Sequence, residues 1–394
     1  MPTKVVLFFG IAGVKLDECA QKIAQRHFGV TSVQKLQEHF PYSFISLDEE
    51  IKKSNPKKDV DIQHFLGGTY NLTRKRKIWE EAAAIVKKKI GQCDTDFCFV
   101  TIHLVYYYLN HYFSFINTNF IKEINPWVCF SLIDDIYAIE KRINEDMLNK
   151  EVYNLSYSWE AILSWRTAEM MTADILINSC GANGILNYFI STKQHIRTLL
   201  DIIKNPKCFK IYLSFPITDT RYSEDLRKYI DEVRVFLHEN FVCFDPLGID
   251  EIRFVIEDGT VKFIPRWPFG YGESIYDDNK DKDVESPNGN INYYEKLIRI
   301  ISDHIIIRDY RYIDQSDCMV ICRGLSAREK VGKVGFSSGV DKELAYAIAT
   351  EKEAVLLDDN IIDKNKHIGV FDRINAHYND FQQLKNDFEG KIRE

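Results

Sequence analysis

The stretch Lys210–Ile217, KIYLSFPI, decides how the chain is divided. A short apolar run of this kind is typical of a buried strand. The amphipathic run SEDLRKYIDEVRVFLHENF follows it and predicts a helix, and VCFDPLG then predicts a second strand. Strand, helix and strand in this order indicate that an α/β pattern begins again here, after an earlier one has ended near residue 200.

The first half of the chain carries the same alternation of strands and helices. We predict its strands at KVVLFFG (4–10), Phe97–Leu104, Trp127–Asp134 and Ala173–Ser179. Helical patterns lie between them, which is the arrangement of a parallel sheet covered on both faces. The sequence therefore predicts two doubly wound α/β domains, over residues 1–200 and 205–394.

A polar stretch interrupts the second half at Glu273–Asn290, ESIYDDNKDKDVESPNGN. It is rich in Asp, Lys, Asn and Gly, and such a composition predicts a long loop. We expect a loop or a mobile lid within the second domain.

Composition and charge exclude several classes of protein. The 394 residues carry a formal net charge of −7, which gives no support to a nucleic-acid-binding face. No apolar run reaches the length of a membrane span, and the first residues lack the pattern of a signal peptide. The nine cysteines are scattered without metal-binding spacing, so we expect reduced thiols, no metal, no cofactor and a cytoplasmic location.

The stretch Ser337–Ala349, SSGVDKELAYAIA, predicts a helix that begins with small residues. Glu343 is expected on its first turn, where the helix dipole stabilises an anion. One interpretation is an ordinary capping or surface residue, and the other is a carboxylate at the mouth of a pocket.

Three separated segments bear on that choice. They are IYLSFPITDTR, RDYRYIDQSDCMVI and SSGVDKELAYAIATEKEAVLL, in this order within residues 208–360. In order and spacing they resemble motifs of the nucleoside 2-deoxyribosyltransferase family and of the related deoxynucleoside monophosphate N-glycosidases. The resemblance implies that Glu343 is the nucleophile, that Asp309 acts at the base, and that Tyr212 lies beside the sugar. It also places Asp317 among the substrate-binding residues.

The resemblance further implies a 5′-phosphate site. Transferases of free nucleosides carry an acid where this chain has Ser337, whereas the monophosphate glycosidases resemble it in having serine. A hydroxyl at a helix N-terminus can bind a phosphate, Gly339 allows a close approach, and Arg221 can supply a bidentate contact. The alternative for Ser337 is a plain helix cap. Phe215 replaces the glycine of the family turn and is expected to narrow or reshape the pocket.

The first domain carries FFGIAGVKLDE (8–18), which looks like a degraded phosphate-binding loop. Gly10 and Gly13 precede Lys15 with one residue missing from the GxxxxGK[ST] pattern, and Leu16 stands where a hydroxyl residue holds magnesium. The half resembles adenylate-kinase-like nucleotide kinases more weakly, with His103, Asp134 and Arg142 as further candidates for a nucleotide site. We expect weak ATP binding at most, and little phosphoryl transfer.

The favoured function is release of a base from a nucleoside 5′-monophosphate, with water or another base accepting the sugar. Two alternatives stay open: an NAD glycohydrolase that depletes nucleotides, and a non-catalytic nucleotide-binding regulator. The resemblance also implies a homodimer or larger homo-oligomer, because family members complete their sites with a neighbouring protomer.

Overall fold

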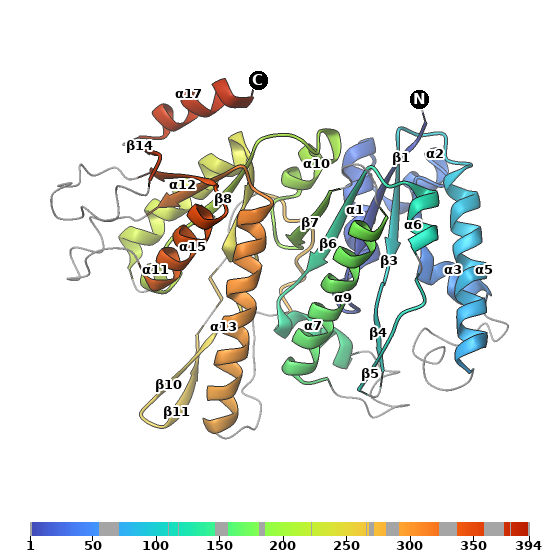
Figure 1. Ribbon diagram of the computed structural model, residues 1–394, viewed down its shortest axis with the longest axis horizontal. Coiled ribbons are helices and arrows are strands. Elements are labelled where there is room, and N and C mark those ends of the chain that lie inside the picture. The colour runs from blue at the N-terminus through green and yellow to red at the C-terminus, as the bar shows by residue number, and fades with distance from the viewer. Residues whose placement is uncertain are drawn as a thin grey trace. The chain divides into compact units, whose positions relative to one another are not determined.

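The computed structural model divides the chain into two compact units (Figure 1). Unit 1 holds residues 1–193, 253–265 and 274–300, and unit 2 holds residues 194–252, 266–273 and 301–394. The structure describes residues 2–54, 71–108, 110–116, 118–145, 157–180, 186–221, 223–264, 266–267, 272–280, 291–322, 337–357, 374–378 and 380–392. No helix among these residues is long and apolar enough to cross a membrane.

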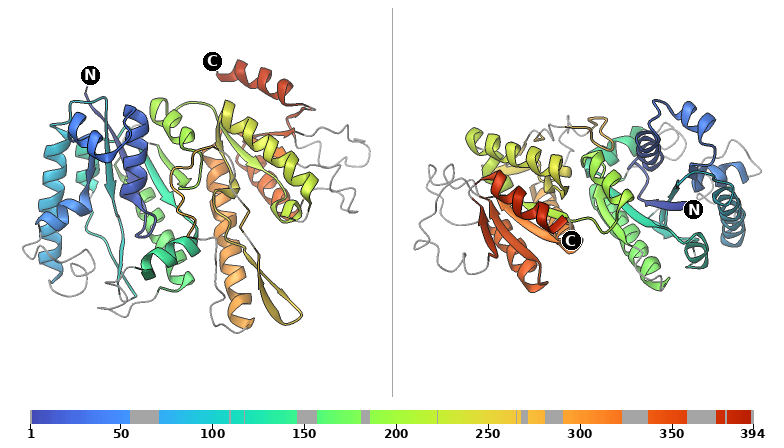
Figure 2. Two further views of the ribbon diagram at one scale, coloured as in Figure 1. Left: turned by 180° about the vertical axis from the view of Figure 1, so that it is seen from behind. Right: turned by 90° about the horizontal axis from the view of Figure 1, so that it is seen from above.

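Unit 1 is built on a five-stranded parallel sheet, with helices on its faces (Figure 2). The strands lie in the order β2-β3-β1-β6-β7, with bounds Phe44–Ser46, Phe97–Ile102, Lys4–Phe9, Val128–Ile133 and Asn187–Ser191. The helices are α1 (Leu16–Phe28), α2 (Val33–His39), α3 (Leu47–Ser54), α5 (Leu72–Ile90), α6 (Thr118–Ile124), α7 (Ile136–Glu145) and α9 (Trp159–Ser179). Strands β1, β3 and β6 are almost wholly buried and apolar, as expected for a parallel sheet covered on both faces.

The predicted strand at Ala173–Ser179 is wrong, because these residues end helix α9. The buried residues Ala173, Leu176 and Ile177 follow helical spacing, while Ile175 between them is 60% exposed. A strand would have placed Ile175 on the same face as Ala173 and Ile177. The fifth strand of the sheet is β7, from the later run NYFIS.

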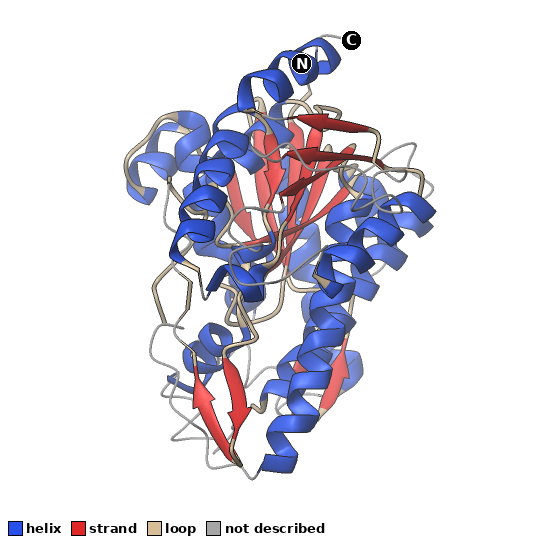
Figure 3. Cartoon of the chain, turned by 90° about the vertical axis from the view of Figure 1, so that its left-hand side faces the viewer, coloured by secondary structure: helices blue, strands red, loops and turns tan. Residues whose placement is uncertain are grey.

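Two segments from the second half of the sequence belong to unit 1. The ribbon β10–β11 (Phe254–Glu257 and Thr260–Phe263) lies beside the start of helix α13 (Ile291–Asp314), as Figure 3 shows. Phe254 packs against Tyr294 and Trp159, with ring centroids 5.2 and 6.4 Å apart.

The residues expected to form a lid are tied to unit 1 where the structure describes them. Asp278 accepts two hydrogen bonds from Arg142, at 2.9 and 2.7 Å, and Lys280 pairs with Glu145 at 2.6 Å. The placement within the second domain is therefore wrong for 274–280, and residues 281–290 lie outside the described part of the chain.

Unit 2 contains a second parallel sheet, with the order β14-β13-β12-β8-β9. The strands are Ala376–Tyr378, Glu353–Leu357, Cys318–Cys322, Lys210–Ser214 and Val242–Phe244. The chain leaves β8 for β9 on one side and later returns to β12 on the other, so the topological switch point lies between β8 and β12. Ligands of open α/β sheets bind outside the carboxyl ends of the strands at such a point.

Helices and a short 3-10 turn complete unit 2. They are α10 (Ile196–Lys204), α11 (Ile217–Arg221), α12 (Glu224–Asn240), the turn Pro246–Gly248, the second part of α13, α15 (Ser338–Ala349) and α17 (Phe381–Ile392). Helix α12 begins at the cap Ser223 and buries Leu226, Ile230, Val233 and Leu237 against the sheet. This spacing forms one apolar stripe, which explains why its sequence predicted the helix.

A fully buried ion pair fixes helix α12 to the residue after β9. Arg234 donates to the Asp245 carboxylate at 2.7 Å, and neither side chain is exposed. Asp245 also accepts from the backbone N–H of Leu247 at 2.9 Å and contacts His238. Burial alone would raise the pKa of Asp245, but Arg234 and His238 outweigh it and hold that pKa well below its usual range.

We predict that Arg234→Met destabilises the protein by about 3 kcal/mol or more, because it leaves a buried carboxylate without its cation. Lys228→Met is the matched control, since Lys228 lies on the same helix and forms an exposed pair with Glu224. Its effect should stay within about 0.5 kcal/mol. Urea unfolding of both variants measures the difference, and equal losses would contradict the assignment.

Candidate functional site

The site in unit 2 begins at the carboxyl end of β8. Ser214 is the last residue of that strand, and its hydroxyl donates a hydrogen bond of 2.5 Å to Glu343 Oε2. Glu343 belongs to α15, which packs on β12 and β13. The helix begins at Ser338, so Glu343 lies on the second turn and not, as predicted, on the first. Its position over the end of the sheet comes from packing, and the helix dipole contributes less than expected.

Helix α13 supplies the second carboxyl group of the site. Asp309 is buried, and its Oδ1 accepts from Arg308 Nε at 2.9 Å and lies 2.8 Å from Arg308 Nη2. Arg308 Nη1 donates to the backbone oxygen of Ile249 at 2.7 Å. Burial and then the charge of Asp309 raise the pKa of Glu343, so the two carboxyl groups are near enough to interact electrostatically. The structure thus brings together Glu343 and Asp309, from segments that are distant in sequence.

Tyr212 completes the group on the sheet side. Its side chain is wholly buried, with the ring centroid 6.2 Å from that of Tyr312 on α13. Burial first, and then the charges of Asp309 and Glu343, raise the pKa of Tyr212 well above its ordinary value, so the phenol stays protonated. Its hydroxyl has no hydrogen-bond partner of ordinary geometry among the residues that the structure describes. The Tyr212 hydroxyl nevertheless lies close enough to Glu343 to lower the pKa of that carboxyl.

The two carboxyl groups hold protons more tightly than usual. Burial and the nearby Asp309 raise the pKa of Glu343 to about 8, while the hydroxyls of Ser214 and Tyr212 act in the opposite direction. Burial also raises the pKa of Asp309, against the effect of Arg308. Two carboxylates in one desolvated site cannot both ionise at low cost, so the pair keeps one proton at neutral pH.

Ser337 is the N-cap of α15. Its Oγ accepts from the backbone N–H of Val340 at 3.4 Å, which is the capping contact that was the alternative interpretation. Gly339 is the second residue of the helix, and among the described residues a Cβ there would contact the Ser337 hydroxyl, at 4.0 Å. Among the described residues, few atoms therefore lie near Gly339 at the N-terminus of α15, one turn before Glu343.

Arg221 and Phe215 have internal partners. The Arg221 guanidinium forms an ion pair with the buried Asp250, which already supplies the anion that a phosphate would have provided. Phe215 is 4% exposed and packs edge-to-face on Trp267 in the core. The described contacts of both residues are with the body of unit 2.

Asp317 lies at the other end of the sheet. It precedes β12, accepts from the backbone N–H of Lys210 at 2.7 Å, and donates its own N–H to the Lys210 oxygen at 2.8 Å. Lys210 begins β8, whereas Ser214 ends it. The structure therefore places Asp317 away from Glu343, where it fixes the register of β8 against β12.

Sequence reasoning missed Ser214 and Arg308. Ser214 is a small polar residue that follows three buried apolar residues at the end of a strand, and that position is a usable signal in a parallel sheet. Arg308 directly precedes Asp309, but nothing in the sequence shows that the two neighbours on a helix bond with each other.

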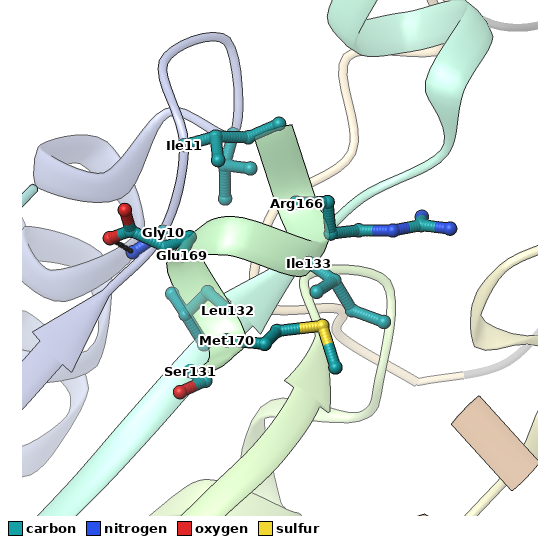
Figure 4. A pocket seen from close by; sticks show the side chains of 9 residues that line it. Gly10, Ile11, Ser131, Leu132, Ile133, Arg166, Glu169 and Met170 are labelled. Carbon is teal, nitrogen blue, oxygen red and sulfur yellow. Dashed lines mark hydrogen bonds between the residues drawn. The ribbon is translucent and has the colours of Figure 1, made fainter. Parts of the chain in front are cut away.

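In unit 1, a carboxylate of the same unit accepts a hydrogen bond from the loop after β1. Glu169 of α9 accepts from the backbone N–H groups of Gly10, Leu104 and Val105, at 3.2, 2.9 and 2.7 Å. Figure 4 shows its carboxylate beside Gly10. The neighbouring cavity measures about 10 Å³, room for about one water. Burial raises the pKa of Glu169 to about 7, although His103 and these N–H groups favour its ionised form.

The other candidates for a nucleotide site also have internal partners. Gly13 has φ +82°, and its carbonyl accepts from Arg142 at 2.8 Å. Arg142 in turn bonds with Asp134 at 2.6 Å and with Asp278. Lys15 pairs on the surface with Glu18 at 3.3 Å. In the described loop, the Gly10 N–H, the Gly13 carbonyl and the Lys15 side chain all have partners within the protein. The nucleotide site remains a prediction from the sequence.

His103 lies at the carboxyl end of β3 in unit 1. Its Nδ1 contacts the Gly10 carbonyl, and its Nε2 lies 3.4 Å from Asp48. Within the described ranges, no group of three His, Cys, Asp or Glu side chains is placed to hold a metal ion.

A scan against models of known protein families finds no match for this chain, and a search of curated proteins finds none. The likeness to the deoxyribosyltransferases and to the nucleotide kinases therefore stays a prediction from the quoted motifs.

We predict that Glu343→Gln changes the dependence of stability on pH. The folded-state pKa of Glu343 is about 8, above its unfolded value, so the folded state binds the proton more tightly. The wild-type carboxyl therefore loses stability as pH rises from about 4.5 to about 8, whereas a neutral amide does not. The variant should unfold at a higher temperature than wild type at pH 8.5, with the gap closing towards pH 5. A difference in unfolding temperature that does not change with pH would show that the pKa of Glu343 is the same in the folded and unfolded states.

Proposed function

We propose that unit 2 cleaves the N-glycosidic bond of a nucleotide. The observation that carries the proposal is Glu343 bonded to Ser214 at the end of β8, with the buried Asp309 near enough for its charge, after burial, to raise the pKa of Glu343 to about 8. Breaking this bond builds positive charge at the sugar C1′ and negative charge on the departing base. A carboxylate stabilises the first, and a protonated carboxyl neutralises the second.

Glu343 is the group that meets the sugar. Glu343 is partly exposed among the described residues, and the Ser214 hydroxyl fixes the direction of one of its oxygens. In the reaction its carboxylate attacks C1′ and forms a glycosyl ester, which water or a second base then breaks. The protonated phenol of Tyr212 donates to a sugar or ester oxygen without competing as a base.

Asp309 is the group that meets the base. It is buried and has a raised pKa, as a general acid requires at neutral pH. It gives its proton to a ring nitrogen as the C1′–N bond breaks, and in the second half of the reaction it takes a proton from water.

The substrate class is a nucleoside 5′-monophosphate, by the resemblance of the motif around Ser337. The start of α15 supports it, since backbone N–H groups at a helix N-terminus attract a phosphate and Gly339 carries no side chain there. Arg221 is held by Asp250 through one nitrogen, Nη2.

The test is release of free base, detected by mass, from nucleosides, nucleoside monophosphates with ribose or deoxyribose, and NAD. We expect the monophosphates to react best, and Glu343→Gln to lower the rate on the order of 10³-fold or more. Asp341→Asn is the control, because it replaces an exposed carboxylate on the same helix and should stay within about twofold of wild type.

The pH dependence follows from the shared proton. Above pH about 8 the pair loses its remaining proton, so Asp309 can no longer protonate the base, and kcat/KM should fall. No base release from any member of the panel, or a Glu343→Gln variant within tenfold of wild type, would refute the proposed function.

A further inference from the structure

The two carboxyl groups of the pair have unequal surroundings. Asp309 has a cation partner, because Arg308 approaches its Oδ1 with two nitrogens, at 2.9 and 2.8 Å. Among the described residues, the hydrogen-bond partners of Glu343 are hydroxyls, Ser214 at 2.5 Å and Tyr212, and the charge of Arg308 has a smaller effect on it than these do. A guanidinium stabilises a carboxylate far more than a hydroxyl does, so one negative charge shared by the two groups is more stable on Asp309.

Arg308 is itself held in place. Its third nitrogen, Nη1, donates to the Ile249 oxygen at 2.7 Å, and its side chain is 4% exposed. Turning the guanidinium away from Asp309 would break this bond and leave a buried cation unpaired. The bias towards charge on Asp309 is therefore built into the fold, independently of any ligand.

We propose that Arg308 is a positioning residue that keeps the negative charge on Asp309 in the unliganded protein, so that the proton of the pair rests on Glu343. The placement of the proton is a property of the chain alone, and only its catalytic consequence rests on the proposed function. Among the described residues, Tyr212 interacts with both carboxyl groups and Tyr312 with Asp309, while Glu251 acts on Arg308 and Asp245 on Tyr312. Both tyrosines stay neutral, because burial raises the pKa of each, to well above 10.

The consequence is a resting state that is not yet reactive. Glu343 must lose its proton to attack C1′, and Asp309 must gain one to protonate the base. Moving the single proton from the Glu343 carboxyl to the Asp309 carboxylate does both, with no change in the net charge of the pair. Positive charge that develops at C1′ favours the move, because it stabilises the Glu343 carboxylate. The unliganded site thus holds its nucleophile neutral until a sugar is bound.

The proton can be located by carbon-13 NMR of protein labelled at the carboxyl carbons of Asp and Glu, without substrate. The signals of the pair are assigned with Glu343→Gln and Asp309→Asn. At pH 7 we expect Glu343 at the position of a protonated carboxyl and Asp309 at that of a carboxylate. In Arg308→Met we expect the reverse, with Asp309 at the position of a protonated carboxyl and Glu343 at that of a carboxylate. In Arg308→Lys the two signals should stay as in wild type. Arg311→Met removes an arginine from the same helix and should change neither signal.

Asp309→Asn gives a second test should Arg308→Met fail to fold. Removing the neighbouring charge should lower the pKa of Glu343 from about 8, with the effect of burial remaining, so that a larger fraction of Glu343 is ionised at pH 7 than in wild type. A wild-type Glu343 that is ionised at pH 7, or an Arg308→Met variant with the wild-type order, would overturn the inference. Because no substrate is present, this result is independent of base release: either proposal can fail while the other stands.

Discussion

The site in unit 2 depends on one buried and one partly buried carboxyl group, Asp309 and Glu343, near the end of one strand. Asp309 and Glu343 come from two helices, and the energy of placing a second negative charge in that space keeps one proton on the pair. The surroundings accommodate this arrangement with donors that do not titrate at neutral pH: the Ser214 hydroxyl, the Tyr212 phenol and the Arg308 guanidinium. A site that served only stability would be more stable with apolar side chains in place of a buried ionic group. This cost is the physical reason to assign chemistry to the pair.

In unit 1 the buried Asp134 is paired with cations. Its buried charges are neutralised by partners from the same unit: Asp134 lies 2.6 Å from Arg142 and 3.2 Å from Lys193, and Asp278 adds a second anion to Arg142. The Gly10 backbone N–H, which a phosphate would need, is bonded to Glu169. The two units therefore share a parallel-sheet plan, and in unit 2 two carboxyl groups, Glu343 and Asp309, both with raised pKa, lie near the switch point of the sheet.

The sequence predicted the two α/β sheets, because long apolar strands and amphipathic helices such as Glu224–Asn240 have periods that local sequence records. It also predicted Glu343, Asp309 and Tyr212 as one group, by the order of three motifs. It could not predict the contribution of Arg308, since that depends on the direction of one side chain on a helix. It misplaced Ala173–Ser179, where β-branched and apolar residues lie on a helix, and it assigned residues 274–280 to the wrong unit because their partner Arg142 is far away in sequence.

Covalent trapping tests the central claim most directly. A 2′-fluoro analogue of a cleaved nucleoside monophosphate should slow the breakdown of a glycosyl ester, so that the intermediate accumulates. The account predicts that the intact mass rises by one sugar phosphate, that the peptide containing Glu343 carries it, and that Glu343→Gln stays unmodified. Base release from the analogue with no adduct, or with the adduct on another residue, would contradict it.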